Sequence, residues 1–209
     1  MKRFTATRVF NKALQEGDIA IFAGDSLCDE AYAYDRPGNL YLGNYPGAIS
    51  IGLGMAICNE RRVFVFCDDW YFVQNISEAL HVGISKCSNM FIVVLRSGQY
   101  VESSKSPTIF SSMVSPRGML YNMGFLVHNY KGYFNKGNPI KEIKSILNVS
   151  HGPLIVVLDV EFASKKSNVS YLERNSIEDI KDFIFSEATT AYNHKPPIMP
   201  LSGIIGLEE

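Results

Sequence analysis

Residues 62–100, RVFVFCDDWYFVQNISEALHVGISKCSNMFIVVLRSGQY, decide the fold that the sequence predicts. Two short apolar runs, at 63–66 and 91–95, are rich in β-branched and aromatic residues and lie on either side of a helical pattern. This order is typical of a strand–helix–strand unit whose parallel strands are buried. Asp69 and Ser97 follow the two runs, and ligands of open α/β sheets bind beyond the carboxyl ends of the strands. The two side chains are therefore candidates to share one hard cation.

The composition describes a soluble globular protein of one domain. The chain has 209 residues, of which 46% are apolar and 20% are charged, which is enough for a sizeable core. Its net charge of −1 gives no general attraction to nucleic acid or to an anionic membrane. No apolar run is long enough for a membrane span, and residues 1–20 lack the apolar centre of a signal peptide. We therefore predict a cytoplasmic protein with neither a nucleic-acid nor a membrane partner.

The rest of the chain extends this unit to a single-domain α/β fold, a doubly wound and mainly parallel sheet with helices on both faces. Small residues recur between positions 43 and 57 and predict a helix that packs close to another backbone, in this chain or in a partner. We predict one domain over residues 1–190 and a C-terminal extended arm over residues 191–209. Further strands are predicted at 19–23, 39–42, 125–130 and 153–160, and helices at 4–16, 28–34, 75–85, 119–124 and 140–147.

Simpler interpretations of single residues stay open at this point. Asp69 at a strand end can act as the N-cap of the next helix. The Gly52-Leu53-Gly54 fragment lacks the third glycine of a dinucleotide fingerprint, so we attribute it to helix packing. The four cysteines form no Cys-x-x-Cys pair, and the four histidines show no spacing typical of metal ligands.

Four stretches, taken in order, resemble one family. They are residues 30–41, Gly43-Asn44-Tyr45-Pro46, Asp68-Asp69-Trp70 with Asn75, and Ser97-Gly98-Gln99-Tyr100 with Pro107-Thr108. With these stretches the chain resembles the diphosphate-binding (PP) domain of thiamine-diphosphate enzymes over roughly residues 3–161. It looks most like the small PP subunits or domains of sulfopyruvate and phosphonopyruvate decarboxylases. The last three stretches stand at the family's Gly-Ser-Met-Gly turn, its metal-binding Gly-Asp-Gly and its Asn-Gly-x-Tyr.

The resemblance implies a site for Mg²⁺ and for the diphosphate of the cofactor. By position, Asp69, Ser97 and the backbone carbonyl of Gln99 would hold the metal against the diphosphate. The backbone amides of Trp70 and Tyr71 would meet the diphosphate at a helix start, where N–H groups point outward.

The other half of the implied site lies at the turn that precedes the segment of small residues. The carbonyl of Gly43 would face the aminopyrimidine, and Tyr45 would bend thiamine diphosphate into its reactive shape. The chemistry implied is decarboxylation of a 2-oxo acid, for which the cofactor is the electron sink. The implied cofactor-binding residues are Gly43, Asn44, Tyr45, Asp69, Trp70, Tyr71, Ser97, Gln99 and Tyr100.

Five positions of this site depart from the family pattern, of which Asn44 and Pro46 alter the turn that frames the pyrimidine. Ser97 replaces an Asn and offers a hydroxyl, a group that also binds Mg²⁺ in P-loops. Trp70 replaces a Gly at a point where the backbone approaches the phosphate. Asp68 replaces the other Gly and adds an anion, with Arg96 and Lys105 as the nearby cations that could compensate it.

The leading hypothesis is a PP-type (beta) subunit of a thiamine-diphosphate- and Mg-dependent decarboxylase of a small anionic 2-oxo acid such as sulfopyruvate or phosphonopyruvate. In the family the activating glutamate lies on a second, PYR domain, and this chain is too short for both. The resemblance therefore implies a PYR-type partner chain, self-association, or both. The alternative is a diverged, non-catalytic PP-fold protein that acts as an interaction or regulatory module, and a synthase or transferase with the same half-site is a third reading.

Overall fold

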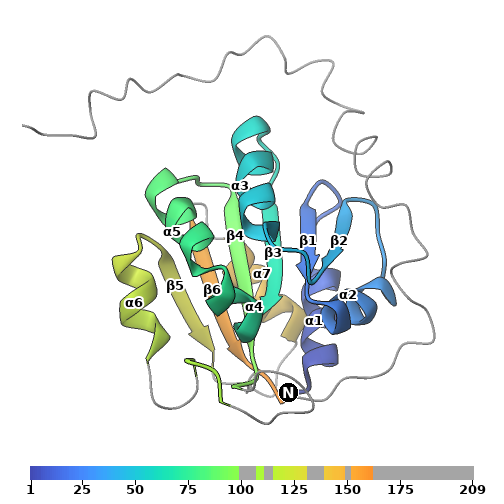
Figure 1. The fold of residues 1–209 in the computed structure, drawn as a ribbon. Helices are drawn as coiled ribbons and strands as arrows, with labels where there is room; N and C mark the ends of the chain where they lie inside the picture. Colours follow the sequence, from blue (N-terminus) through green and yellow to red (C-terminus); the bar gives the residue numbers. More distant parts are fainter. Residues whose placement is uncertain (99–106, 111–114, 131–138, 149–151, 162–209) are drawn as a thin grey trace, which may run out of the picture.

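Within the described residues, six parallel strands form one sheet in the order β2-β1-β3-β4-β6-β5 (Figure 1). The structure, a computed structural model, describes residues 1–98, 107–110, 115–130, 139–148 and 152–161. The expected doubly wound α/β fold is confirmed, whereas the expected arm lies outside the described residues. The elements are α1 (Arg3–Ala13), β1 (Ile19–Ala23), α2 (Asp25–Tyr32), β2 (Asn39–Gly43), α3 (Ala48–Cys58), β3 (Val63–Asp68), α4 (Asp69–Gln74), α5 (Ile76–Ser85), β4 (Met90–Arg96), α6 (Pro116–Asn122), β5 (Leu126–Tyr130), α7 (Pro139–Leu147) and β6 (Leu154–Asp159).

Helices cover both faces of the sheet, so the central strands are buried on both sides. One apolar cluster joins the sheet to α3, α4, α5 and α6, and the other joins it to α1, α2 and α7 (Figure 1). All five residues of β1 are buried, as are the first five residues of β3. This two-sided burial is the physical reason that these strands appear in the sequence as continuous apolar runs and not as alternating ones.

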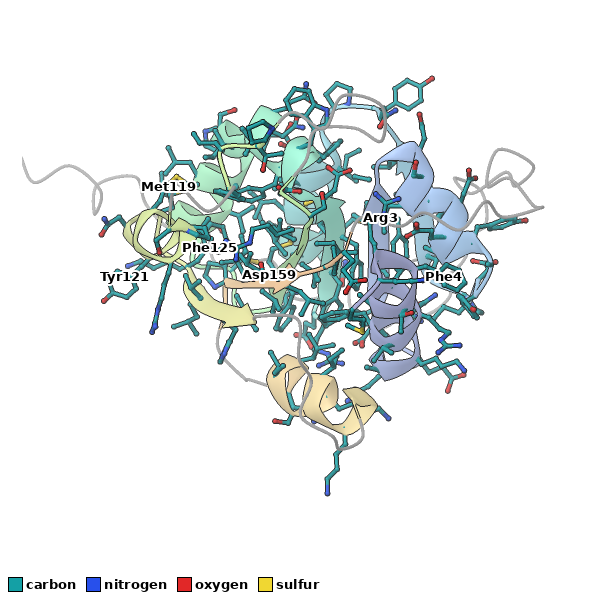
Figure 2. All side chains as sticks on the ribbon, turned by 90° about the horizontal axis from the view of Figure 1, so that it is seen from below. Arg3, Phe4, Met119, Tyr121, Phe125 and Asp159 are labelled. Atoms are coloured by element: carbon teal, nitrogen blue, oxygen red, sulfur yellow. The ribbon has the colours of Figure 1, made fainter. Side chains whose placement is uncertain are left out.

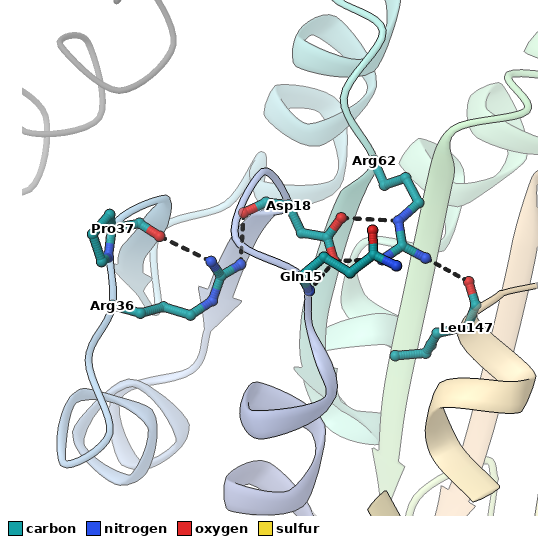
Figure 3. A network of polar contacts seen from close by, with 6 residues as sticks. All are labelled: Gln15, Asp18, Arg36, Pro37, Arg62 and Leu147. Atoms are coloured by element: carbon teal, nitrogen blue, oxygen red, sulfur yellow. Dashed lines mark hydrogen bonds and ion pairs between the residues drawn. The ribbon is translucent and has the colours of Figure 1, made fainter. Parts of the chain in front are cut away.

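A network of polar contacts ties the strands together at the edge where they begin (the amino edge). The carboxylate of Asp18, before β1, accepts hydrogen bonds from Arg62 Nε (2.8 Å), from Arg62 Nη2 (2.6 Å) and from the backbone N–H of Gln15 (2.7 Å) (Figure 3). Arg62 Nη1 also donates to the carbonyl of Leu147 at the end of α7 (2.8 Å), and Arg36 Nη2 donates to the carbonyl of Asp18 (2.6 Å). The network joins the segments before β1, β2 and β3 to the end of α7, while ligands of such sheets bind at the opposite edge.

Several helices begin earlier than the sequence predicts. The helix expected at 28–34 begins at Asp25, directly after the turn that ends β1, and the helix expected at 119–124 begins at Pro116, whose fixed φ suits the first helical turn. A short additional helix, α4, begins directly after β3 because the Asp68 side chain caps it. No helix in the described part of the chain is long and apolar enough to cross a membrane.

One of the small residues of α3 allows a close contact with the sheet. A Cβ at Gly52 would lie 2.5 Å from Val65 Cγ2, so the helix sits directly on β3. At Gly54, no atom of the described residues lies within 4 Å of the corresponding position. A second close approach occurs between α5 and the residues that follow α6, where a Cβ at Gly83 would lie 1.8 Å from the carbonyl oxygen of Met123.

Candidate functional site

A buried carboxylate at the end of β3 is held by the end of β4. Asp69 is the first residue of α4, and its side chain is fully buried. Its Oδ1 accepts hydrogen bonds from the backbone N–H of Ser97 (3.2 Å) and from the Ser97 hydroxyl (3.4 Å). Parallel pairing of β3 with β4 places Asp68 opposite Leu95, so both strands end at the same edge (the carboxyl edge). The structure therefore brings together the two side chains that the sequence selected as metal ligands.

Two residues that were not among the candidates complete the surroundings of this carboxylate. Asp69 Oδ2 accepts hydrogen bonds from the backbone N–H of Gly98 (3.2 Å) and from the hydroxyl of Thr108. The Thr108 backbone N–H in turn donates to the carbonyl of Gly98 (3.1 Å). The signal for Thr108 was present in the Pro107-Thr108 match, but a separation of 39 positions from Asp69 hides the contact from spacing arguments.

The hydrogen-bond partners of Asp69 within the described residues are neutral groups. Burial raises the pKa of its carboxyl above the usual range, and the hydrogen bonds from Thr108 and Ser97 lower the pKa only in part. A buried carboxylate that has neutral donors but no cation carries an uncompensated negative charge when it ionises. Such a position favours the binding of a cation beside it.

The spacing of the oxygen atoms suits a small hard cation. Two adjacent ligands of an octahedral Mg²⁺ at about 2.1 Å lie about 3 Å apart, close to the 3.4 Å between Asp69 Oδ1 and Ser97 Oγ. The described residues contain no group of three or more His, Cys, Asp or Glu side chains that could hold a metal ion. A metal at Asp69 would therefore take its other ligands from hydroxyl, carbonyl, water or ligand oxygens.

The neighbouring carboxylate has a different role, because Asp68 caps α4. Its Oδ1 accepts a hydrogen bond from the backbone N–H of Tyr71 at 2.7 Å. Burial raises the pKa of the Asp68 carboxyl, while the backbone N–H groups of Tyr71 and Trp70 and the charge of Arg3 lower it. Both amides that the resemblance assigned to the diphosphate thus interact with a carboxylate of this chain.

The turn between β2 and α3 is fixed from two sides. The backbone N–H of Gly24 donates to the carbonyl of Gly43 (2.6 Å), and the side chains of Asn44 and Asp25 bond to each other and to each other's backbone N–H. Together with Tyr45 and Pro46, Asp25 and Asn44 line an open depression of about 310 Å³.

Tyr71 connects this turn to the end of β3. Its hydroxyl donates to the carbonyl of Tyr45 (2.7 Å) and accepts from the backbone N–H of Ala48 (3.1 Å). Burial raises the pKa of the Tyr71 phenol to about 12. The Tyr45 side chain lines the depression and is 75% exposed.

The remaining predicted residues lie elsewhere or outside the described residues. Arg96 forms an ion pair with Asp159 at the end of β6, so it does not serve as the partner of Asp68. Arg3, whose charge acts on Asp68, forms a buried ion pair with Glu30 (3.0 Å). Figure 2, a view from below, shows Arg3 at the start of α1, Asp159 on β6 near the centre of the molecule and Tyr121 of α6 at its margin. Gln99, Tyr100 and Lys105 lie outside the described residues.

Two curated proteins are similar to this chain in sequence. Sulfopyruvate decarboxylase subunit beta of Methanothermobacter thermautotrophicus is 29% identical over 102 residues, which are 48% of this chain and 55% of the relative. Sulfopyruvate decarboxylase of Methanosarcina acetivorans is 32% identical over 83 residues, which are 39% of this chain and 21% of the relative. The match thus spans about half of the first relative and a fifth of the second. No family model matches the chain.

Solved structures share the fold. An enzyme from Mycobacterium smegmatis assigned to the thiamin diphosphate-dependent class superimposes with a TM-score of 0.60 at 15% identity, over 79% of this chain and 32% of that one. The 2-oxoglutarate:ferredoxin oxidoreductase of Magnetococcus marinus gives 0.58 at 12% identity, over 80% and 65%. At these identities the likeness concerns the fold alone. The chain has the thiamine-diphosphate-binding fold, and the resemblance to a PP-type domain is confirmed.

Proposed function

We propose that this chain is the PP-type subunit of a thiamine-diphosphate- and Mg-dependent decarboxylase that acts on a small anionic 2-oxo acid. The observation that carries the proposal is the buried Asp69 carboxylate, which has neutral donors and lies against Ser97 at the carboxyl edge. The sequence similarity to two sulfopyruvate decarboxylases supports the same class of substrate.

In this proposal the site has two parts, a metal position at Asp69 and Ser97 and a ligand-binding depression beside the turn before α3. Asp69 and Ser97 would hold Mg²⁺, since their oxygen atoms lie at a suitable spacing. Thiamine diphosphate, when bound, supplies the electron sink for loss of CO₂ from the 2-oxo acid. Tyr71 holds the turn of Gly43 and Tyr45 at a fixed distance from Asp69, through its bond to the Tyr45 carbonyl. The open depression beside Tyr45 and Asn44 would accept the part of the ligand that lies away from the metal.

The fit to the diphosphate itself is incomplete. The metal position at Asp69 and Ser97 suits a hard cation, but the Tyr71 amide at the start of α4 already donates to Asp68. A diphosphate at this place requires the Asp68 side chain to move first.

The lengths of the two relatives support a partner chain. The first is about 185 residues long, since 102 residues are 55% of it, and the second is about 395 residues long, since 83 residues are 21% of it. The longer protein therefore has room for a second domain of similar size, whereas the shorter one is named as a subunit. We propose that a PYR-type chain fills this role here and supplies the activating glutamate.

Exposed aliphatic side chains of α3 and α5 offer contacts for that partner. Ile51 and Ile57 of α3 are 40% and 57% exposed, and Leu80 and Ile84 of α5 are 43% and 62% exposed. The two helices lie side by side on one face of the sheet (Figure 1). A group of exposed aliphatic side chains of this kind is typical of a protein–protein interface.

One observation favours a second candidate function, the non-catalytic PP-fold module. Asp68 satisfies the amide donors that a diphosphate would need, which is the arrangement expected of a chain that has stopped binding the cofactor. Such a module would keep the fold and the exposed aliphatic side chains of α3 and α5 but bind neither metal nor cofactor.

The proposal is tested by measuring CO₂ release. The chain would be co-expressed with the PYR-type chain encoded by its source, and the complex assayed with sulfopyruvate, phosphonopyruvate and pyruvate. We expect release that depends on thiamine diphosphate and Mg²⁺, that favours the two anionic substrates, and that is lost in Asp69→Ala. Release that is absent with every substrate, in a complex that forms, would favour the module.

A further inference from the structure

Asp68 occupies a confined position between α4 and the turn that follows β1. Its Oδ1 accepts the Tyr71 backbone N–H (2.7 Å), and its Oδ2 lies 3.5 Å from the position that a Cβ at Gly24 would take. β1 and β3 are neighbours, and the chain leaves them toward opposite edges of the sheet, to β2 from one and to β4 from the other. Ligands of doubly wound folds bind at this reversal of strand order. Asp68 therefore stands at the point of the sheet where a ligand is expected.

We propose that the Asp68 carboxylate occupies the position of a diphosphate at the start of α4. The cofactor then binds only after this side chain moves. Asp68 thereby sets the affinity of the chain for thiamine diphosphate. This inference rests on the proposed function and names a residue that regulates its site.

Asp68 would compete with a diphosphate in two ways. Both groups need the same N–H donor, and both are negatively charged. The Tyr71 N–H can serve the carboxylate of Asp68 or a phosphate oxygen, but a phosphate oxygen in the same position would overlap the carboxylate. The carboxylate also repels an anion that approaches it. Arg3 compensates part of this charge, but Arg3 is already paired with the buried Glu30.

The two neighbouring aspartates are held to different degrees. Asp68 is only partly buried, unlike the fully buried Asp69 beside it. The proposal requires the Asp68 carboxylate to leave the Tyr71 N–H. Asp69, by contrast, is held by hydrogen bonds from Ser97, Gly98 and Thr108.

A purely structural role for Asp68 predicts a different experimental result. An aspartate N-cap stabilises its helix, and asparagine caps about as well as aspartate. Removal of an ordinary cap weakens folding and leaves ligand affinity unchanged or lower. Removal of a competitor raises ligand affinity. Binding measurements therefore separate the two roles.

The test is isothermal titration calorimetry of the full chain with pyrophosphate and with thiamine diphosphate, each with Mg²⁺. Fluorescence of Trp70, the only tryptophan of the sequence, gives a second readout next to the site. Asp68→Ala removes the carboxylate, and Asp68→Asn keeps a capping oxygen but removes the charge. Glu60→Gln, at an exposed position before β3, is the control for loss of one negative charge. Asp68→Asn also replaces Asp68→Ala if the latter does not fold.

We expect both Asp68 variants to bind pyrophosphate more tightly than the wild type, Asp68→Ala by about tenfold or more, and Glu60→Gln to behave as the wild type. Equal affinity of wild type and Asp68→Ala for both ligands overturns the inference and leaves the proposed function standing. A gain for pyrophosphate without binding of thiamine diphosphate by any of the proteins contradicts both the inference, which concerns affinity for this cofactor, and the proposed function. No binding of either ligand by any of the proteins overturns both.

Discussion

Asp18 at the amino edge and Asp69 at the carboxyl edge are both buried carboxylates, but within the described residues only Asp18 is paired with a cation. Asp18 accepts two hydrogen bonds from the Arg62 guanidinium, at 2.8 and 2.6 Å. Asp69 accepts its hydrogen bonds from the backbone of Ser97 and Gly98 and from the hydroxyls of Ser97 and Thr108. A buried aspartate is therefore neutralised by an arginine at one edge of the sheet and held only by neutral donors, among the described residues, at the other edge.

The difference distinguishes a structural charge, Asp18, from a candidate functional one, Asp69. The charge of the Asp18 carboxylate is balanced by its two hydrogen bonds from Arg62, and this pair joins the segments that precede β1 and β3. A carboxylate with neutral donors is held in place without being neutralised, so it can still bind a cation. The following predictions test this contrast, from the largest expected effect to the smallest.

Loss of the arginine at the amino edge should have the largest effect on stability. Arg62→Ala leaves Asp18 buried without its guanidinium and also removes the bond to the Leu147 carbonyl. We expect the free energy of unfolding to fall by about 3 kcal/mol, measured by urea denaturation. Arg8→Ala, at an exposed position of α1, is the control and should change little. A loss below about 1 kcal/mol for Arg62→Ala would mean that the amino edge does not depend on this pair.

Truncation at the carboxyl edge should have a smaller but distinct effect. Asp69→Ala leaves the N–H groups of Ser97 and Gly98 and the Thr108 hydroxyl without their acceptor. We expect a loss of about 2 kcal/mol in the same denaturation experiment. Ser97→Ala, which removes the 3.4 Å bond from the hydroxyl to Asp69 and keeps the bond from the backbone N–H, should cost less than about 1 kcal/mol. Equal losses for the two variants would contradict the central place of Asp69.

The Tyr71 hydroxyl links the two parts of the candidate site. Tyr71→Phe removes the bond to the Tyr45 carbonyl and leaves the Ala48 N–H without its acceptor. We expect a loss of about 1 kcal/mol in the free energy of unfolding. Hydrogen exchange of the turn before α3 should become faster in this variant. Tyr45→Phe, at a largely exposed side chain, should leave both measurements unchanged, and an effect as large as that of Tyr71→Phe would sink this account of the turn.

The smallest expected effect is a dependence of stability on pH. Burial raises the pKa of Asp69 above the 3.8 of an ordinary carboxyl. From pH 3.8 up through the raised pKa the folded chain therefore binds more protons than the unfolded chain, and stability falls as the pH rises. The stability of the wild type relative to Asp69→Asn should accordingly be greatest near the acid end of this window and decrease toward neutral pH. A relative stability that increases with pH would show that Asp69 is stabilised as an anion.

Much of the fold could be predicted because its strands are buried on both faces. The strands Val63–Asp68 and Met90–Arg96 are recognisable in the sequence as apolar runs, and their parallel pairing places their ends side by side. Asp69 and Ser97 follow from this placement with no knowledge of their rotamers. The starts of α2 and α6 were less visible, because they depend on a turn and on a proline.

The rest of the site could not be predicted from spacing. Thr108 reaches Asp69 across 39 positions. The cap made by Asp68 depends on a side-chain rotamer, and the bond from Tyr71 to Tyr45 depends on how two loops meet. Such contacts are consequences of tertiary packing and leave no local pattern in the sequence.

The most direct test of the account is a thermal-unfolding titration with Mg²⁺ and thiamine diphosphate, added singly and together. The wild type, Asp68→Asn and Asp69→Asn would be compared at saturating ligand. A ligand at 100 times its Kd adds about 2.7 kcal/mol to stability. We predict stabilisation of the first two proteins that requires both ligands, is abolished by EDTA and is absent in Asp69→Asn. The same stabilisation in Asp69→Asn, or none in any of the three proteins, would contradict the assignment of Asp69 as the residue that recruits the metal.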